Sequence, residues 1–128
     1  MWIYNGIEVT QEDVDPYVGF VYIIYNLDNN RKYIGKKLFT RAATYQKNKR
    51  KRRKRVQSDW ITYTGSNKQL NEDIAAGATI QREILHLCKS KGWCSYLETE
   101  EIFKHKALLD PVYYNDWVSA KIRRKHLK

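Results

Sequence analysis

The chain has 128 residues, of which 42% are hydrophobic and 30% charged, and its formal net charge is +10. This length is enough for one hydrophobic core and short for two ordinary domains, so we expect a single domain. The sequence contains no long apolar run, and its start lacks the basic and apolar regions of a signal peptide. We therefore expect no membrane span and a cytoplasmic protein.

The positive charge is concentrated in two stretches. Eight of the nine residues 47–55 are basic, and five more Lys and Arg residues lie in 121–128, which leaves the remainder of the chain mildly acidic. Clustered cations on such a body favour contact with a polyanion, because each cation that meets a phosphate releases counterions. The alternative is a solvated charged loop.

The two cysteines, Cys88 and Cys94, are too few for a disulfide framework and are most simply reduced, buried thiols. A zinc site would combine them with His86 and His105. The spacing of these four residues matches no usual pattern of closely paired ligands. A zinc-stabilised adaptor is therefore the weakest functional hypothesis.

The first predicted element is a hairpin. Residues 2–4 and 7–9 flank Asn5-Gly6, which favours a type I′ turn because both central residues of that turn need positive φ. Residues 11–16 are acidic, end at a proline and are expected to form a linker.

Residues 19–37 predict a second hairpin, with strands rich in β-branched and aromatic side chains on either side of a polar turn. A two-residue turn at Asn29-Asn30 would make Tyr22 face Lys37 across the strands. Any loop with an even number of residues places Tyr22 and Tyr33 on the same face. One face of this hairpin is then apolar core, and the other presents two tyrosines and a lysine.

Residues 38–57 are expected to leave the domain as an excursion, with a short helix at 41–46 before the basic run. A capping box formed by Ser66 and Gln69 then opens a helix that Gly77 closes.

Residues 80–88 predict a third, central strand, and residues 93–109 the longest helix. The resulting fold class is α+β: a small domain with a three-stranded antiparallel sheet flanked by helices, and with an N-terminal β-hairpin. The apolar face of the long helix is expected to hold Trp93, Tyr96, Phe103 and Ala107.

Two tyrosines and a glycine form a recognisable motif. Tyr22 and, eleven residues later, Tyr33-Ile34-Gly35 resemble the core motif of the GIY-YIG nuclease family. Downstream, Glu98 in a predicted helix and Asn115 after a short extended segment occur in the order that the family has. The resemblance departs at the first glycine of the motif, because Phe20 occupies its position and Gly19 comes one residue earlier.

The resemblance extends to the phage and mobile-element, homing-type branch of the family. In that branch a basic insertion and a W-x-x-Y-x-G-S segment follow the YIGKK strand, as residues 38–57 and 60–66 do here. The resemblance implies three parts of the chain: a hairpin and linker (1–18), a nuclease domain (19–117) that contains the basic insertion, and a basic tail (118–128).

The resemblance implies a DNA endonuclease that depends on a divalent metal and hydrolyses phosphodiester bonds. Glu98 would hold Mg²⁺ or Mn²⁺, with phosphate and water as the other ligands. Tyr22 or Tyr33 would position or deprotonate the attacking water, and a tyrosine with a pKa near ~10 needs a cationic neighbour to act as a base. Lys36 has the family's lysine position, and Lys37 is its rival.

The family also has an arginine on the helix after the motif, with a tyrosine or histidine four residues later. Arg41 and Tyr45 have this spacing, which corresponds to one helical turn. Arg55, together with residues 60–63, is the alternative if the whole basic run is an insertion.

Each of these assignments has a structural alternative. The tyrosines can be ordinary sheet aromatics. Ser95 and Glu98 have the spacing of a capping box, and Glu100 and Glu101 can substitute for Glu98. Asn115 can be a turn residue.

Phosphate contacts are expected from both basic stretches, and the partner is DNA, bound by a monomer or a homodimer. The alternative function is a non-catalytic, basic nucleic-acid-binding protein, whose binding would be sensitive to salt. The predicted DNA-binding residues are Lys37, Lys49, Arg50, Lys51, Arg52, Arg53, Lys54, Arg55, Arg123, Arg124 and Lys125.

Overall fold

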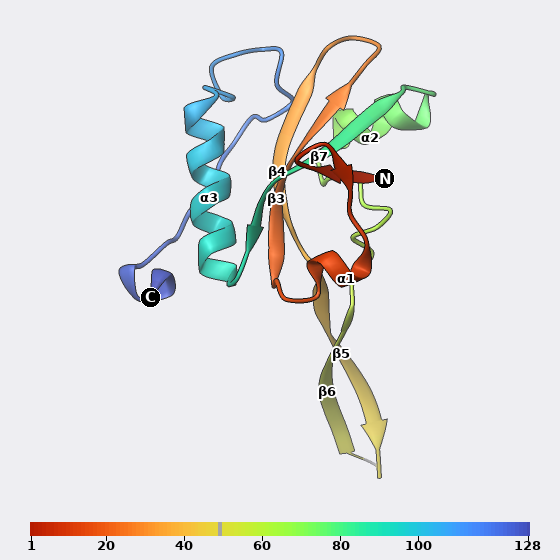
Figure 1. The fold of residues 1–128 in the computed structure, drawn as a ribbon, viewed down its shortest axis with the longest axis vertical. Coiled ribbons are helices and arrows are strands. Elements are labelled where there is room, and N and C mark those ends of the chain that lie inside the picture. The colour runs from red at the N-terminus through yellow and green to blue at the C-terminus, as the bar shows by residue number, and fades with distance from the viewer. Residues whose placement is uncertain (49) are drawn as a thin grey trace.

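A computed structural model describes residues 1–48 and 50–128. In these residues a five-stranded sheet has the order β2-β1-β7-β3-β4, and β5 and β6 form a separate two-stranded ribbon (Figure 1). The strands are β1 (Trp2–Tyr4), β2 (Ile7–Glu8), β3 (Gly19–Asn26), β4 (Lys32–Leu38), β5 (Thr40–Lys47), β6 (Arg50–Gln57) and β7 (Ile80–Cys88). The helices are α1 (Gln11–Val14), α2 (Lys68–Ala75), α3 (Lys91–Lys104) and the 3₁₀ helix η1 (Arg124–Leu127).

The α+β class is confirmed, and β7 is central, between β1 and β3. The sheet has five strands and not the three that were predicted. Strands β7, β3 and β4 are antiparallel as expected, but β1 pairs in parallel with β7 and adds the N-terminal hairpin to the same sheet. No helix in the described residues is long and apolar enough to span a bilayer.

The N-terminal hairpin has the predicted turn, since Asn5 and Gly6 have φ values of 51° and 80°. It is fixed to the body by Trp2, which is 2% exposed and donates a hydrogen bond of 2.7 Å from Nε1 to the Trp60 carbonyl. The predicted linker 11–16 instead contains α1. The Thr10 amide and hydroxyl both donate to the Asp13 carboxylate at the start of this helix, which gives the four residues a local reason to be helical.

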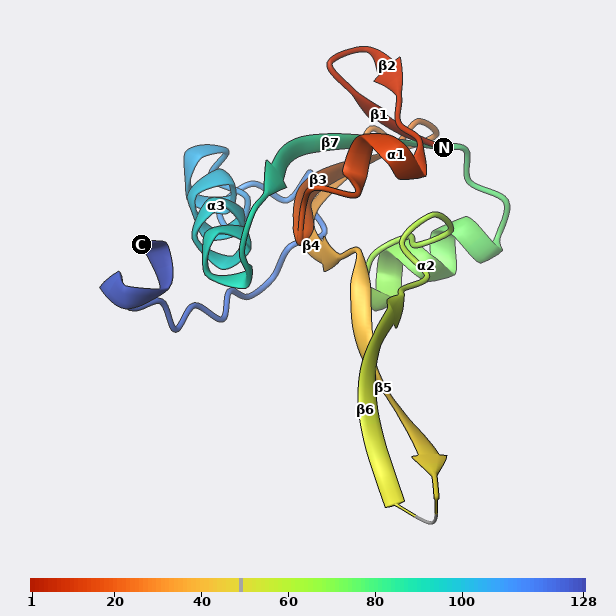
Figure 2. The same ribbon diagram turned by 60° about the horizontal axis from the view of Figure 1, so that its bottom comes forward.

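Strand β3 is buried on both faces. Phe20, Tyr22 and Ile24 belong to one core, which α1, α2 and the segment around Trp60 cover. Val21 and Ile23 belong to a second core, against α3. Figure 2 shows α2 and α3 on opposite sides of the sheet. The tyrosine-bearing face is therefore packed rather than open, and Tyr22 is only 1% exposed.

The register of the β3–β4 hairpin differs from the prediction by two residues. Tyr22 pairs with Gly35 and not with Lys37, because a four-residue loop replaces the two-residue turn. The Asn30 amide donates to the Asn26 carbonyl and the Asn26 amide to the Arg31 carbonyl, which closes this loop, and Asn30 has a φ of 61°. A shift of two residues preserves the side-chain alternation, so Tyr22 and Tyr33 share a face as predicted.

The helix predicted at 41–46 is wrong, because these residues form β5. Every residue from Thr40 to Lys47 pairs with a residue of β6. Helix propensity is a weak preference, and pairing with the adjacent basic strand overrides it here.

The long helix begins and ends earlier than predicted, and its buried face is a different one. Ser90 caps α3 by accepting a hydrogen bond of 3.1 Å from the Trp93 amide. Cys94 and Ile102 are buried, whereas Phe103, predicted to be core, is 59% exposed. Ser95 and Glu98 lie inside the helix that Ser90 caps, so the capping-box alternative for Glu98 is wrong.

Helix α2 is capped by Asn67, not by the predicted Ser66. The Asn67 Oδ1 accepts a hydrogen bond of 2.9 Å from the Leu70 amide. Gly77 follows the helix with a φ of 106°, which confirms the predicted stop, since a residue with a Cβ avoids this conformation.

We predict that Trp2→Ala lowers the free energy of unfolding by about 3–5 kcal/mol, because it opens a cavity where β1 joins the body. Urea denaturation measures this change. Leu109→Ala is the matched control, since Leu109 is 82% exposed and should change little. A loss below ~1 kcal/mol for Trp2→Ala would mean that the hairpin does not contribute to the core.

Candidate active site

A cleft of about 330 Å³ lies at the outer edge of β4, the last strand of the sheet. Its walls come from β3 and β4, from the loop before α2, from α3 and from the segment after Pro111. The lining includes five of the seven predicted catalytic residues: Tyr22, Tyr33, Lys36, Glu98 and Asn115.

Tyr22 reaches this edge because the residue opposite it has no side chain. A Cβ on Gly35 would collide with the Tyr22 hydroxyl and would lie 2.6 Å from its Cζ. The phenol therefore lies across Gly35, and its hydroxyl reaches the cleft from a core position. Burial raises the pKa of Tyr22 well above its usual value of 10.0, so this hydroxyl is a hydrogen-bond donor at neutral pH.

Tyr33 is the more accessible of the two phenols. Its Oη lies 3.2 Å from the Ser66 Oγ, and its ring lies 6.2 Å from that of Tyr22 between centroids. Burial also raises the pKa of Tyr33, although the hydrogen bond with Ser66 opposes the rise. Both phenols thus remain protonated donors in the protein alone.

The two candidate lysines have different surroundings. Lys36 lines the cleft, and its Nζ donates a hydrogen bond of 2.7 Å to the Ser95 Oγ. The Lys37 Nζ lies 2.7 Å from an Asp59 carboxylate oxygen and 4.1 Å from the centre of the Tyr63 ring. Lys37 is thereby paired with Asp59 and does not line the cleft, and Lys36 is the lysine that lines it.

Glu98 projects from α3 into the cleft and is half-buried. Burial raises the pKa of Glu98, and the nearby charge of Lys36 opposes this rise. Throughout residues 1–48 and 50–128, no ion pair includes Glu98. A hydrogen bond with the Lys36 backbone also opposes the rise in this pKa. The carboxylate is thus not committed to an ion pair and can accept a further ligand.

The other two acidic candidates on α3 are placed elsewhere. Glu100 is exposed and does not line the cleft. Glu101 is 7% exposed, and its two carboxylate oxygens lie 2.9 Å from His86 Nε2 and 3.2 Å from His105 Nδ1. Neither carboxylate faces the tyrosines.

Asn115 has both ends of its amide occupied by the backbone of Ile34. Its Oδ1 accepts a hydrogen bond of 3.0 Å from the Ile34 amide, and its Nδ2 donates one of 2.8 Å to the Ile34 carbonyl. Asn115 thus takes the place of a neighbouring strand and holds the edge of β4. It positions the cleft wall, and both polar atoms of its amide take part in this bridge.

A family model described as "Putative endonuclease segE, GIY-YIG domain" matches residues 2–118. The chain belongs to the GIY-YIG nuclease family. The match places it in the segE branch and covers the N-terminal hairpin as well as the core motif. No curated protein and no solved structure gives a match.

The remaining two predicted catalytic residues lie outside the cleft of this GIY-YIG chain, on the ribbon. Arg41, with Arg55, lines a neighbouring groove that shares Lys36 with the cleft. Tyr45 is further out, and on a strand four residues span about 13 Å rather than one helical turn. Its ring lies 5.2 Å from the Lys54 ammonium.

The four residues of the zinc hypothesis, the weakest of the three, are not placed as a metal site. Cys88 and Cys94 are free and buried, and both histidines are bonded to Glu101. Among the residues that the structure describes, no group of three or more His, Cys, Asp or Glu side chains is placed to hold a metal ion.

Several lining residues of the cleft lie outside the predicted set. Ser66, predicted to cap a helix, is bonded to Tyr33. Asp116 and Trp117 also line the cleft, and their position directly after Asn115 is the signal that could have indicated them. Trp117 is 70% exposed at the cleft.

We predict that Glu98→Gln stabilises the metal-free protein at pH 7. A folded-state pKa above the unfolded value means that the charged carboxylate disfavours folding at pH values above both. The advantage of the Gln variant should shrink as the pH falls through the folded pKa and vanish below the unfolded one. Thermal denaturation in EDTA between pH 4 and pH 8 tests this, and an advantage that grows toward acid would contradict it.

We predict that Asn115→Asp lowers the free energy of unfolding by about 1–3 kcal/mol, because a carboxylate oxygen would replace the donor that meets the Ile34 carbonyl. Asn5→Asp makes the same charge change in an exposed turn and serves as the control. If Asn115→Asp kept its full stability, the bridge to Ile34 would not hold the edge of β4.

Proposed function

We propose that this protein is a DNA endonuclease that hydrolyses phosphodiester bonds with the help of a divalent metal ion, Mg²⁺ or Mn²⁺. The observation that carries the proposal is the convergence of Tyr22, Tyr33, Lys36 and Glu98 on one cleft at the edge of β4. Two phenol donors and a cation can bind and polarise a phosphodiester, and a carboxylate outside any described ion pair can hold a metal ion beside it.

The carboxylates of the cleft suit a hard cation. Glu98 is half-buried without an ion pair among the described residues, and Asp116 lines the same cleft. Magnesium in proteins is commonly held by one or two carboxylates, with phosphate and water completing its shell. Glu98 would hold the ion, with Asp116 as a second oxygen donor. A bound divalent ion supplies Lewis-acid stabilisation of charge on a phosphoryl oxygen.

The chain's own groups have roles that follow from their protonation and placement. Tyr22 and Tyr33 remain protonated, so we assign them to positioning the phosphate and the attacking water by hydrogen bonding, and not to removing a proton. Lys36 contributes positive charge at the cleft. Arg41 lines the groove that adjoins Lys36, so we propose that Arg41 rather than Tyr45 takes part in binding the phosphate.

The basic stretches are proposed to hold the DNA on either side of the cleft. The ribbon carries most of the predicted contacts, and the tail carries Arg123, Arg124 and Lys125 on and beside η1. Lys49 belongs to the same prediction and lies outside the described residues. A homing role would further require recognition of a particular DNA site.

We predict that purified protein nicks supercoiled plasmid in the presence of Mg²⁺ and that Glu98→Gln lowers the rate by about 10²–10³-fold, the loss typical for a group that stabilises transition-state charge. Glu100→Gln removes the same charge from the same helix outside the cleft and should retain the activity. Gel electrophoresis of the plasmid forms over time provides the measurement.

The outcomes separate the two candidate functions. Nicking that persists undiminished in Glu98→Gln would remove Glu98 from the active site. If the protein binds DNA in a salt-sensitive way but cleaves none with any divalent metal ion tested, the alternative of a non-catalytic nucleic-acid-binding protein is supported.

A further inference from the structure

The β5–β6 ribbon stands apart from the rest of the molecule. It projects from the body as a free two-stranded extension (Figure 1, Figure 2). Its strands are eight residues each, which gives a reach of about 27 Å. Within the described residues, no member of either strand belongs to the two hydrophobic cores. Such a ribbon contributes little to folding and is available to a partner.

The ribbon carries charge of one sign only. Residues 40–57 contain no Asp or Glu, and β6 begins with six consecutive basic residues. A two-stranded ribbon is marginally stable by itself in water, and like charges this close repel each other. The partner that relieves this repulsion must be a polyanion.

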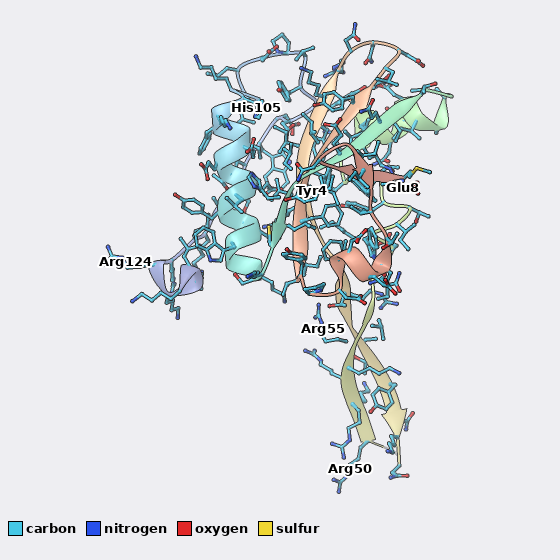
Figure 3. All side chains as sticks on the ribbon, viewed as in Figure 1. Tyr4, Glu8, Arg50, Arg55, His105 and Arg124 are labelled. Atoms are coloured by element: carbon cyan, nitrogen blue, oxygen red, sulfur yellow. The ribbon has the colours of Figure 1, made fainter. Side chains whose placement is uncertain are left out.

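The charge lies on both faces of the ribbon. Because successive side chains of a strand point to opposite faces, the pairing of β5 with β6 sorts the cations into two sets. Figure 3 shows Arg50 at the far end of the ribbon and Arg55 near the body. One face carries Arg41, Lys47, Arg50, Arg52 and Lys54, and the other carries Lys51, Arg53 and Arg55.

Charge on both faces indicates a partner with anionic walls on both sides. A ribbon that lay flat on a polyanion would use only one charged face. The major groove of B-form DNA is about 12 Å wide, is walled by two phosphate backbones and admits a two-stranded ribbon, whereas the minor groove is about 6 Å wide. In duplex RNA the major groove is deep and narrow and is closed to side chains.

The base of the ribbon is fixed relative to the candidate active site. Only Phe39 separates β5 from β4, and its buried ring stacks on Phe20 with centroids 4.8 Å apart. Ser58 holds the returning strand, since its amide donates to the Phe39 carbonyl and its hydroxyl to the Leu38 carbonyl. A groove lined by Arg41, Arg55 and Lys91 continues from this base to Lys36 in the cleft.

We propose that the β5–β6 ribbon inserts into the major groove of duplex DNA and contacts the phosphates on both sides, so that the substrate is B-form duplex DNA held at a fixed distance from the cleft. This inference rests on the proposed endonuclease function for its partner, and its test does not depend on cleavage.

The test uses two matched triple variants in the full-length Glu98→Gln protein. Arg50→Gln/Arg52→Gln/Lys54→Gln removes two arginines and a lysine from one face, and Lys51→Gln/Arg53→Gln/Arg55→Gln removes the same from the other. The probe is a fluorescent 20-base-pair DNA duplex, and anisotropy gives the dissociation constant at several salt concentrations. Each triple variant should reduce the slope of log K against log salt by about 2.7, since three phosphate contacts are lost.

A slope changed by only one of the two variants would overturn the groove insertion in favour of contact through a single face. Thermal denaturation should show that both variants keep the folded body, because the substituted side chains lie outside both cores. Lys51→Gln/Arg53→Gln/Arg55→Gln also removes the hydrogen bonds from Arg55 to Thr40 at the base of the ribbon. If one triple variant unfolds at a clearly lower temperature, the three single substitutions of the same face are tested instead. Each should reduce the slope of log K against log salt by about 0.9.

Two further probes identify the groove. Duplex RNA of the same length has the same phosphate charge and should bind at least about ten-fold more weakly, because its major groove is closed. DNA with bulky groups on the pyrimidine C5 position, which projects into the major groove, should also bind more weakly, while netropsin in the minor groove should have no effect. Equal binding of the RNA, or competition by netropsin alone, would overturn the proposal.

The outcomes separate this inference from the proposed function. If the ribbon binds as described and the wild-type protein does not cut, the endonuclease proposal fails and the inference stands. If the wild-type protein cuts and both triple variants keep the parental slope, the endonuclease proposal stands and the inference fails.

Discussion

The close approach of Tyr22 to Gly35 is the contact on which this structure depends. Tyr22 is buried in the core on one face of β3, a strand that has a core on each face, yet its hydroxyl reaches a solvent-facing cleft because the residue paired with it lacks a Cβ. Any larger residue at position 35 would force the phenol aside, and dense cores accommodate such changes poorly. The hydroxyl therefore gains the rigidity of a core position together with access to the edge of the sheet.

The same strand links every other part of the candidate site. Strand β4 carries Tyr33, Gly35 and Lys36, its outer edge is held by Asn115, and it continues through Phe39 into the ribbon. An edge strand with free backbone groups is a liability, because another strand can pair with it. Here the segment from Val112 to Asn115 occupies those groups with one backbone bridge and one side-chain amide. Closing the edge in this way also forms one wall of the cleft.

Several features could be predicted from the sequence because they depend on local chemistry, or on whether a loop has an even or an odd number of residues. Asn5-Gly6 defines its own turn, and any loop with an even number of residues places Tyr22 and Tyr33 together, so the error of two residues in register left the site intact. The buried face of α3 could not be predicted, because the stripe that meets the sheet includes Cys94 and Glu101 while larger aromatics face outward. The helix at 41–46 failed for a related reason. None of its residues belongs to either described hydrophobic core, so the basic strand that pairs with them decides their conformation.

The free energy of burying charged groups explains why the cations lie on a free ribbon and not in the packed body. The body holds one carboxylate, Glu98, in surroundings that raise its pKa, so a functional charge is kept at some cost to folding. A run of cations placed inside that body would multiply the cost, because each buried charge needs a partner. On an extension that is exposed on both faces, water and salt solvate the same charges until phosphates displace the counterions. The short, rigid junction at Phe39 then lets a segment that contributes little to stability determine where a duplex meets the cleft.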